Sequence, residues 1–342
     1  MVGALIIEAK DAPATKPDRE YTLLTEEWIT GIGSMPVAPT PGPSTTTGMP
    51  GGMMGQGPGG MMGQGPGGMM GSGASVRPVF DTLTVNGKAY GASAPLIVRQ
   101  GERVHLRLIN ANAMDTQVFA LAGHRLTVTH SDGNPIAHPA EVDAVPLGAG
   151  ERADVEFTAD NPGRWHLLGL LENQARPGPL TDVVYDGHEG DSAQDFAANA
   201  QIQIARYSAF GGPSHPNPPD RTYELTLSGG MMMGMGSETS WTINGKSYPN
   251  TDPLDMRPGE RVRIKLVNMS MEDHPMHLHG HTFQVVGIGG QPVDGPLKDT
   301  LTLRPMEAYD IEFVANNPGR WLFHCHNLMH MGGGLMTEVR YR

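Results

Sequence analysis

The sequence predicts an all-β protein that contains two tandem antiparallel β-sandwiches or barrels. Three observations predict this fold class: matching segments recur in the same order along the chain, polar and apolar residues alternate within them, and turn signals separate them. The chain has 342 residues, which is enough for two or three domains of ordinary size. Its 46 glycines and 29 prolines favour turn-rich β structure and at least one unstructured segment.

The first 35 residues contain two short strand-like runs, at residues 2–8 and 21–24. The first run is apolar, but it lacks the basic stretch and the small-residue cleavage site of a signal peptide. We therefore expect the sequence to begin inside a strand. Its first residues do not indicate a cellular compartment.

Residues 36–76 are of low complexity. The unit Gly-Gly-Met-Met-Gly-Gln-Gly-Pro begins at Gly51 and again at Gly59, and a third copy breaks off after Gly67. Such a segment cannot bury enough apolar surface to offset its ordering entropy, so we expect it to be disordered. It is a flexible linker or a collector of Cu(I), because paired thioethers are soft ligands. A shorter Met-rich stretch occupies residues 231–235.

From residue 77 onward the chain repeats itself. The matching pairs are residues 84–90 and 242–248, residues 101–104 and 259–262, and residues 161–165 and 317–321. These pairs lie 158, 158 and 156 residues apart, so the register holds over the whole unit. The sequence therefore contains two homologous domains, which we place at residues 77–210 and 220–342.

Each unit has the pattern of β-strands. Residues 104–109 and 262–267 alternate polar and apolar side chains, which is the period of a half-buried strand. Asn-Gly and Asn-Pro-Gly sequences separate the expected strands as turns.

The second unit concentrates the residues that bind metals. Seven of the 14 histidines and the only cysteine lie in two short segments: His274, His277, His279 and His281, followed by His324, Cys325, His326 and His330. Imidazole and thiolate together suit copper or zinc. A structural zinc site would usually include a Cys-x-x-Cys pair, which this sequence lacks, so copper is favoured.

Strand geometry predicts two separate sites. Successive side chains on a strand point to opposite faces, so His324 and His326 share one face and Cys325 points to the other. Cys325, with His274 and His330, can form the one-thiolate, two-imidazole site of a blue copper centre. His277 and His279 also share a face, and these two can join the pair that flanks Cys325 in a histidine-only cluster.

The first unit lacks these ligands. The positions that correspond to the six ligands compared are occupied by Gln117, Ala120, Ala122, Leu168, Gly169 and Leu170. We therefore expect the fold to form without them.

Charge and composition exclude several classes of function. The formal net charge of −12 argues against a nucleic-acid partner, which would need a basic face. No apolar run approaches the roughly 18 residues of a membrane span. A single cysteine excludes an internal disulfide framework.

The two ligand segments, His-Pro-x-His-Leu-His-Gly-His and His-Cys-His-x-x-x-His, resemble the third and fourth copper motifs of multicopper oxidases. The resemblance implies two cupredoxin-like Greek-key β-sandwiches, the second of which binds copper. Residues 3–8 resemble the end of the family's first domain, so residues 1–35 are interpreted as remnant strands of a missing first cupredoxin domain. The Met/Gly insert resembles Met-rich segments of bacterial copper-resistance oxidases.

The resemblance also implies a role for each ligand. Cys325, His274 and His330 would hold type 1 copper, which takes electrons from the reducing substrate. His277 would bind type 2 copper, and the type 3 pair would be bound by His279, His324 and His326. Electrons would pass from Cys325 through the adjoining histidines to the trinuclear cluster, where O2 becomes water.

The sequence departs from the family pattern in two ways. Many members carry an axial Met ten residues after the Cys, where this chain has Leu335, with Met336 next to it. The two His-x-His motifs of the family's first domain are also absent. A first domain or a partner subunit would have to supply them.

Two functions follow from these observations. The leading interpretation is a multicopper oxidase, laccase-like or cuprous, that couples oxidation of phenolic substrates or Cu(I) to O2 reduction and is incomplete as this chain. The family resemblance implies a periplasmic or extracellular location. The alternative is a copper-binding electron-transfer protein with only a type 1 centre and a Met-rich copper-collecting loop. An inert scaffold is disfavoured by the intact ligands.

Overall fold

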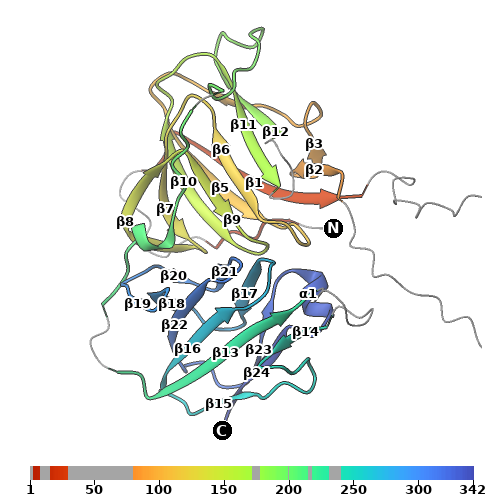
Figure 1. Cartoon of the computed structure of the whole chain (residues 1–342). Helices are drawn as coiled ribbons and strands as arrows, with labels where there is room; N and C mark the ends of the chain where they lie inside the picture. The colour runs from red at the N-terminus through yellow and green to blue at the C-terminus, as the bar shows by residue number, and fades with distance from the viewer. Residues whose placement is uncertain are drawn as a thin grey trace, which may run out of the picture.

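A computed structural model describes residues 3–7, 16–29, 80–171, 178–198, 200–214, 218–230 and 240–342. These residues form two β-sandwiches stacked end to end, with strands β1–β12 in the first and β13–β24 in the second (Figure 1). The Met/Gly segment and the Met-rich stretch at residues 231–235 lie outside the described residues. Within the described ranges, no helix is long and apolar enough to cross a membrane.

The first sandwich contains a seven-stranded and a five-stranded sheet. In spatial order, the larger sheet consists of β3 (Lys88–Ala89), β2 (Thr82–Val85), β1 (Arg19–Trp28), β5 (Arg103–Asn110), β10 (Arg152–Thr158), β7 (Leu126–Ser131) and β8 (Asn134–Val142). The smaller sheet consists of β4 (Leu96–Val98), β12 (Gly178–Tyr185), β11 (Arg164–Leu171), β6 (Gln117–Leu121) and β9 (Ala144–Leu147). A 3-10 turn, η1 (Tyr207–Ala209), precedes the second sandwich.

The second sandwich repeats this arrangement. Its larger sheet consists of β14 (Trp241–Ile243), β13 (Arg221–Gly229), β16 (Arg261–Asn268), β22 (Ala308–Val314), β18 (Phe283–Ile288) and β19 (Gln291–Pro292), and β20 (Leu297–Lys298) also pairs with β18. Its smaller sheet consists of β15 (Leu254–Met256), β24 (Met336–Tyr341), β23 (Arg320–Cys325), β17 (His274–Leu278) and β21 (Thr300–Leu303). The two sandwiches therefore share one arrangement of strands.

The strand and turn predictions are confirmed. Strands β5 and β16 alternate half-buried and buried residues along their whole length, so one face of each contributes to a core. In both Asn-Gly turns the two residues have positive φ, as tight hairpin turns require: 50° and 74° at Asn86 and Gly87, and 52° and 77° at Asn244 and Gly245. The expectation of purely antiparallel sheets was wrong, because each sheet contains one parallel pair: β1 with β5, β4 with β12, β13 with β16, and β15 with β24.

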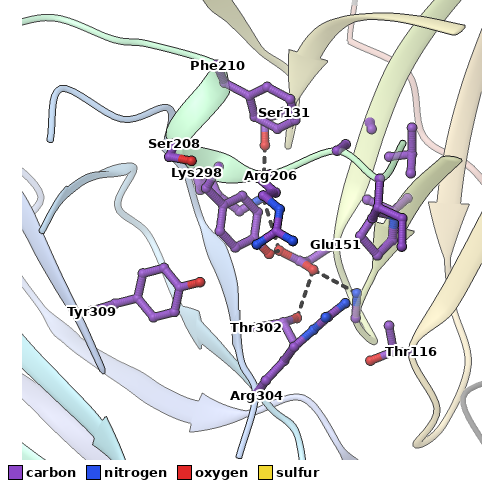
Figure 2. A pocket seen from close by; sticks show the side chains of 18 of the residues that line it. Thr116, Ser131, Glu151, Arg206, Ser208, Phe210, Lys298, Thr302, Arg304 and Tyr309 are labelled. Carbon is purple, nitrogen blue, oxygen red and sulfur yellow. Dashed lines mark hydrogen bonds and ion pairs between the residues drawn. The ribbon is translucent and has the colours of Figure 1, made fainter. Parts of the chain in front are cut away.

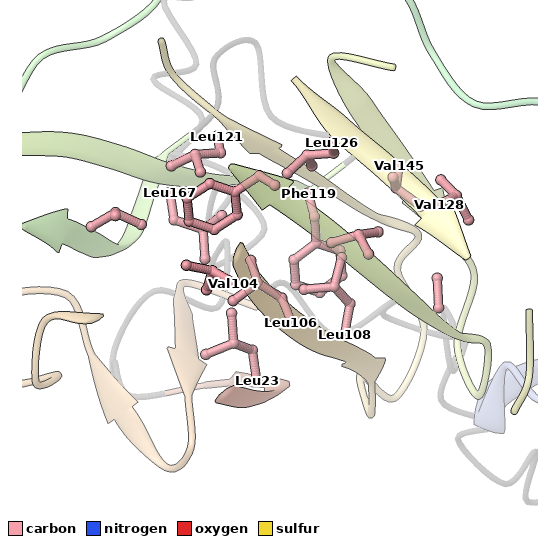
Figure 3. Close-up of a cluster of buried hydrophobic side chains, with 14 of the residues drawn as sticks. Leu23, Val104, Leu106, Leu108, Phe119, Leu121, Leu126, Val128, Val145 and Leu167 are labelled. Carbon is pink, nitrogen blue, oxygen red and sulfur yellow. The ribbon is translucent and has the colours of Figure 1, made fainter. Parts of the chain in front are cut away.

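The structure also corrects one domain boundary. Strand β1 was expected to be a remnant of a missing domain, but it lies between β2 and β5 in the larger sheet of the first sandwich. Its Leu23 is buried in the core with Val104 and Leu106 of β5 (Figure 3). The strand therefore belongs to the first sandwich, and the Met/Gly segment is an insertion between β1 and β2. Residues 3–7 form no strand, and Leu5 and Ile7 are exposed.

Candidate metal centre

Strands β17 and β23 lie side by side and carry most of the predicted ligands. They pair antiparallel, with His277 opposite His324 and Met276 opposite Cys325. A short helix, α1 (Leu328–Gly332), follows β23 and carries His330 at its centre. The side chain of Asn327 caps this helix by accepting hydrogen bonds from two of its backbone amides, which fixes the chain between Cys325 and His330.

The first ligand group consists of Cys325, His274 and His330. The Cys325 sulfur lies 3.8 Å from Nδ1 of His274 and 3.6 Å from Nδ1 of His330, and the two nitrogens are 3.0 Å apart. All three side chains are buried in the second sandwich. One soft sulfur and two imidazole nitrogens that converge on one point form the donor set of a blue copper site.

The electrostatics of this group favour neutral side chains. Burial, with a smaller contribution from neighbouring His330, lowers the pKa of His274 to about 3, so its ring keeps a lone pair for a metal. Burial raises the pKa of the Cys325 thiol well above its ordinary value. A cation at this point would favour the thiolate instead, because metal ligands bind deprotonated. The donor set therefore fits copper.

Three side chains that the sequence analysis did not identify orient these imidazoles. The Ser270 hydroxyl lies 2.8 Å from Nε2 of His274, and a Glu272 carboxylate oxygen lies 3.1 Å from Nε2 of His330. With Nε2 engaged in each ring, Nδ1 faces the sulfur. The Trp241 ring packs against His330, with the ring centres 3.9 Å apart.

The register of β23 and β24 places Leu335 and Met336 relative to Cys325. Met336 pairs with His324, and the Cys325 amide donates to the carbonyl of Leu335. Side chains opposite each other in a sheet share a face, so Leu335 lies on the face of Cys325 and Met336 on the other. Leu335 is fully buried in the same core as Cys325.

The second group consists of His277, His279, His324 and His326. These residues lie on the side of the paired strands β17 and β23 that is opposite Cys325. The ring centre of His277 lies 4.9 Å from that of His279, 5.7 Å from that of His324 and 6.0 Å from that of His326. The Nε2 atoms of His279 and His324 are 3.0 Å apart, which is close enough for both to face one metal ion. The structure thus brings together the predicted residues, with the cysteine on one face and its two neighbouring histidines on the other.

Burial also favours the neutral, metal-binding form of three of these imidazoles. Burial lowers the pKa of His324 to about 4 and also lowers the pKa values of His279 and His326. His324 directs Nδ1 to the carbonyl of Cys325, so its Nε2 faces Nε2 of His279 and can bind the same metal ion. Nδ1 of His326 is buried and has no hydrogen-bond partner in the described part of the chain. An orphaned buried nitrogen beside three other imidazoles fits a metal site.

His281 has a different role from its neighbours. Its ring bridges the His279 carbonyl and the Tyr341 hydroxyl, and His124 makes the same bridge to the Ala122 carbonyl and the Tyr185 hydroxyl in the first sandwich. This histidine therefore belongs to the shared scaffold.

At the ligand positions of the first sandwich, a β-carbon added to Gly169 would lie 2.6 Å from the Gln117 side chain. A cysteine at this position would therefore require the Gln117 and Leu180 side chains to shift.

Comparison with known proteins places these features in a family. Two family models described as multicopper oxidase match residues 64–181 and 217–342. The chain is 33% identical over 333 residues to the multicopper oxidase MmcO of Mycobacterium tuberculosis, an alignment that covers 95% of the chain and 62% of that protein. It is 28% identical over 298 residues to laccase-4 of Thanatephorus cucumeris, with coverages of 74% and 55%.

Solved structures agree on the fold. The structure of Fet3p, described as a multicopper oxidase that functions in iron import, superposes with a TM-score of 0.72 at 18% identity. That match covers 96% of this chain and 66% of the other. The chain therefore spans roughly half to two thirds of the length of the relatives reported above.

Proposed function

The chain belongs to the multicopper oxidase family, and on this premise we propose that it is the copper-binding part of a laccase-like or cuprous oxidase. The proposed reaction couples one-electron oxidation of a phenol or Cu(I) to the reduction of O2 to water. The observation that carries the proposal is the segment His324-Cys325-His326, in which one strand supplies a thiolate to one ligand group and two imidazoles to another.

Each ligand group has a proposed role. Cys325, His274 and His330 would hold type 1 copper, and the histidine group on the opposite face would supply His277 to type 2 copper and His279, His324 and His326 to the type 3 pair. Bound copper would supply the electron transfer and the oxygen chemistry. The chain supplies the connection, because the cysteine is covalently continuous with two histidines of the other group.

The edge of His330 is the proposed point of electron entry. Its Nε2 faces Glu272, whose side chain is 35% exposed. The Glu272 side chain therefore links the buried ring to solvent. Leu328 and Met329 on the same helix are exposed, and Met271 is 81% exposed. An apolar and thioether surface with one carboxylate suits both a phenolic ring and a Cu(I) ion.

The histidine group needs further ligands to complete a trinuclear cluster. A domain or a partner subunit that carries two His-x-His motifs is the proposed source, as the family pattern implies. A periplasmic or extracellular location is likewise proposed from the family, because laccases and copper-resistance proteins act there.

The test is the spectrum of the copper-loaded chain. We expect a strong thiolate-to-copper charge-transfer band that makes the protein blue, and Cys325→Ser should remove it while the chain still binds copper through its histidines. His281→Gln is a matched control, since that ring is engaged in the scaffold. A folded, copper-replete sample without a visible band would refute the assignment.

An electron carrier remains the second candidate, and one observation favours it. Among the described residues, Cys325, His274 and His330 converge on one point, whereas the four-histidine group would need further ligands to match the family's cluster. A blue protein that exchanges electrons rapidly but consumes no O2, even when a His-x-His domain is supplied, would establish this function.

A further inference from the structure

We propose that the first sandwich, which carries no copper ligands of its own, positions His277 through Arg152 and Asp132. The inference rests on the proposed function, because it treats His277 as a ligand. It goes further in assigning a role in the copper site to residues of the neighbouring domain.

Arg152 reaches across the boundary between the sandwiches. Its guanidinium donates two hydrogen bonds to the Asp299 carboxylate, of 2.6 Å from Nη1 to Oδ1 and 2.7 Å from Nη2 to Oδ2. Two parallel charge-assisted bonds fix a carboxylate in both distance and orientation. The side chain of Asp299 is therefore held by a residue of β10.

The fixed carboxylate in turn sets the hydroxyl of Thr300. Oγ1 of Thr300 donates to Oδ1 of Asp299 at 2.8 Å, so its oxygen lone pairs face away from that bond. Nδ1 of His277 lies 3.0 Å from this oxygen and 3.0 Å from the Asp299 carbonyl oxygen. Both neighbours are acceptors, so Nδ1 carries the proton and Nε2 keeps the lone pair that binds a metal.

Asp132 holds the same dipeptide by its backbone. It lies at the end of β7 in the first sandwich and is almost completely buried. Its Oδ2 accepts hydrogen bonds of 3.2 Å from the amides of Asp299 and Thr300, and its Oδ1 accepts one of 2.9 Å from the amide of Arg152. Asp299 and Thr300, which contact His277, are thus held by residues of the first sandwich. Arg152 holds the Asp299 side chain, and Asp132 holds the two backbone amides.

A buried charge network makes this support rigid. The ammonium group of Lys298 lies 3.1 Å from both Asp132 and Glu151. It also donates to the Ser131 hydroxyl, and Figure 2 shows Lys298 with Ser131 and Glu151. Glu151 also accepts a hydrogen bond from Thr302 of the second sandwich. Fully satisfied buried networks have one geometry, because each alternative leaves a charged group unpaired.

A second contact point lies at His326. Gly150, in the loop between β9 and β10, has a φ of +85°, and a β-carbon added to it would lie 2.7 Å from Cδ2 of His326. Only glycine both adopts this conformation readily and allows so close an approach. The loop therefore contacts the His326 ring directly, and the start of β10 supports His277 through Asp299.

The experiment measures Cu(II) binding by the full chain, with the blue band as an internal reference. Arg152→Ala should weaken uptake of the non-blue Cu(II) by about 10–100-fold, the usual effect of removing a partner that orients a ligand. It should also change the paramagnetic resonance spectrum of that copper and leave the blue band intact. Arg152→Lys, which keeps the charge but loses the paired geometry, should restore binding in part.

The matched control is Arg221→Ala. This change removes an arginine–glutamate ion pair of the same type, with Glu260, at a strand end that contacts none of the histidines. Unchanged affinity and spectrum in Arg152→Ala would overturn the proposal, as would an equal loss of blue and non-blue copper, which would show only general destabilisation. If the unaltered chain binds no non-blue copper, the proposed histidine site itself fails, and the inference fails with it.

Discussion

Leu335 shows how one side chain can tune the copper site without binding the metal. It lies on the same face of the sheet as Cys325 and is fully buried, and its carbonyl accepts a hydrogen bond from the Cys325 amide. An apolar side chain offers no lone pair to stabilise Cu(II) over Cu(I), so a leucine here should give a higher reduction potential than a thioether would.

Leu335→Met should therefore lower the reduction potential of the blue copper and preserve its colour. The two side chains have similar volume, so the free energy of unfolding should fall by less than about 1.5 kcal/mol. Redox titration of the blue band gives the potential. Met336→Leu is the control and should leave the potential unchanged, because Met336 lies on the opposite face. An unchanged potential in the first variant and a raised one in the second would assign the axial position to Met336.

Glu27 gives the stability a pH dependence that can be isolated. It is 7% exposed, one of its oxygens has no partner among the described atoms, and burial together with nearby Asp115 raises its pKa to about 7. The ordinary value is 4.5. Between these two values the folded chain holds a proton that the unfolded chain has released, so stability should fall as pH rises from about 4.5 to about 7.

Glu27→Gln should remove this part of the pH dependence, which amounts to at most about 3 kcal/mol at 1.36 kcal/mol per pKa unit. The measurement is the free energy of unfolding across that pH range for the variant and the unaltered chain. Glu26→Gln, on the other face of β1, should leave the slope as it is. Identical slopes for Glu27→Gln and the unaltered chain would show that the carboxylate is already ionised in the fold.

At this scale the sequence predicts ligands better than their partners. The ligands can be found because metal binding needs particular residue types at strand spacing, as at His324, Cys325 and His326. Ser270, Glu272 and Thr300 could not be found, because hydrogen-bonding residues are common on any surface. Only the folded geometry shows which of them meets an imidazole.

At the scale of elements, β1 shows how an insertion conceals a repeat. Residues 18–21 read Asp-Arg-Glu-Tyr and residues 220–223 read Asp-Arg-Thr-Tyr, but they lie 202 residues apart, whereas the segments at Asn86 and Asn244 are 158 apart. Both aspartates accept the same 2.8 Å bond, from the amides of Arg103 and Arg261. This shared motif was the signal that could have placed β1 in the first sandwich.

The position of the insertion predicts that it can be shortened. Trp28 and Thr82 are paired neighbours in β1 and β2, so the two strands meet whatever the length of the segment between them. Deleting residues 49–71 should change the free energy of unfolding by less than about 1 kcal/mol, since loop-closure entropy varies slowly with length. Cu(I) binding and Cu(I) oxidation should both weaken, because the deletion removes seven methionines, six of which form the Met-Met pairs.

A same-length variant separates the thioethers from the loop. Serine should replace Met53, Met54, Met61, Met62, Met69 and Met70, and Cu(I) affinity should fall as far as in the deletion. Competition with a Cu(I) chelator gives the affinity, and thermal unfolding gives the stability. A large stability loss on deletion would show that the segment packs against the fold. Full Cu(I) binding by the serine variant would exclude the collector role.

At the scale of the molecule, the sequence predicts two sandwiches but not how they meet. Repeat spacing and strand alternation depend on neighbouring residues, whereas the interface depends on residues about 150 positions apart, such as Arg152 and Asp299. Charged residues usually face solvent, so nothing in the sequence distinguishes this half-buried pair from a surface one. The interface is also where the sandwich without ligands contacts the histidine group.

The final prediction concerns the completion of that group. His277, His279, His324 and His326 are four ligands on one side, and no His-x-His pair occurs before residue 277 in the 342 residues. A metal cluster needs its full ligand set to hold its geometry, so these residues alone should reduce O2 at no enzymatic rate. Adding a domain with two His-x-His motifs, fused ahead of residue 1 or supplied separately, should restore turnover.

The measurement is oxygen consumption with a phenol or Cu(I) as reductant, before and after the domain is added. A domain whose motif histidines are changed to alanine is the control, and it should dock without restoring activity. If both domains restore turnover equally, the added surface rather than its histidines would be responsible. Rapid oxygen consumption by the 342 residues alone would mean that the four histidines, supported by Arg152 and Gly150 from the neighbouring sandwich, assemble a working site without further ligands.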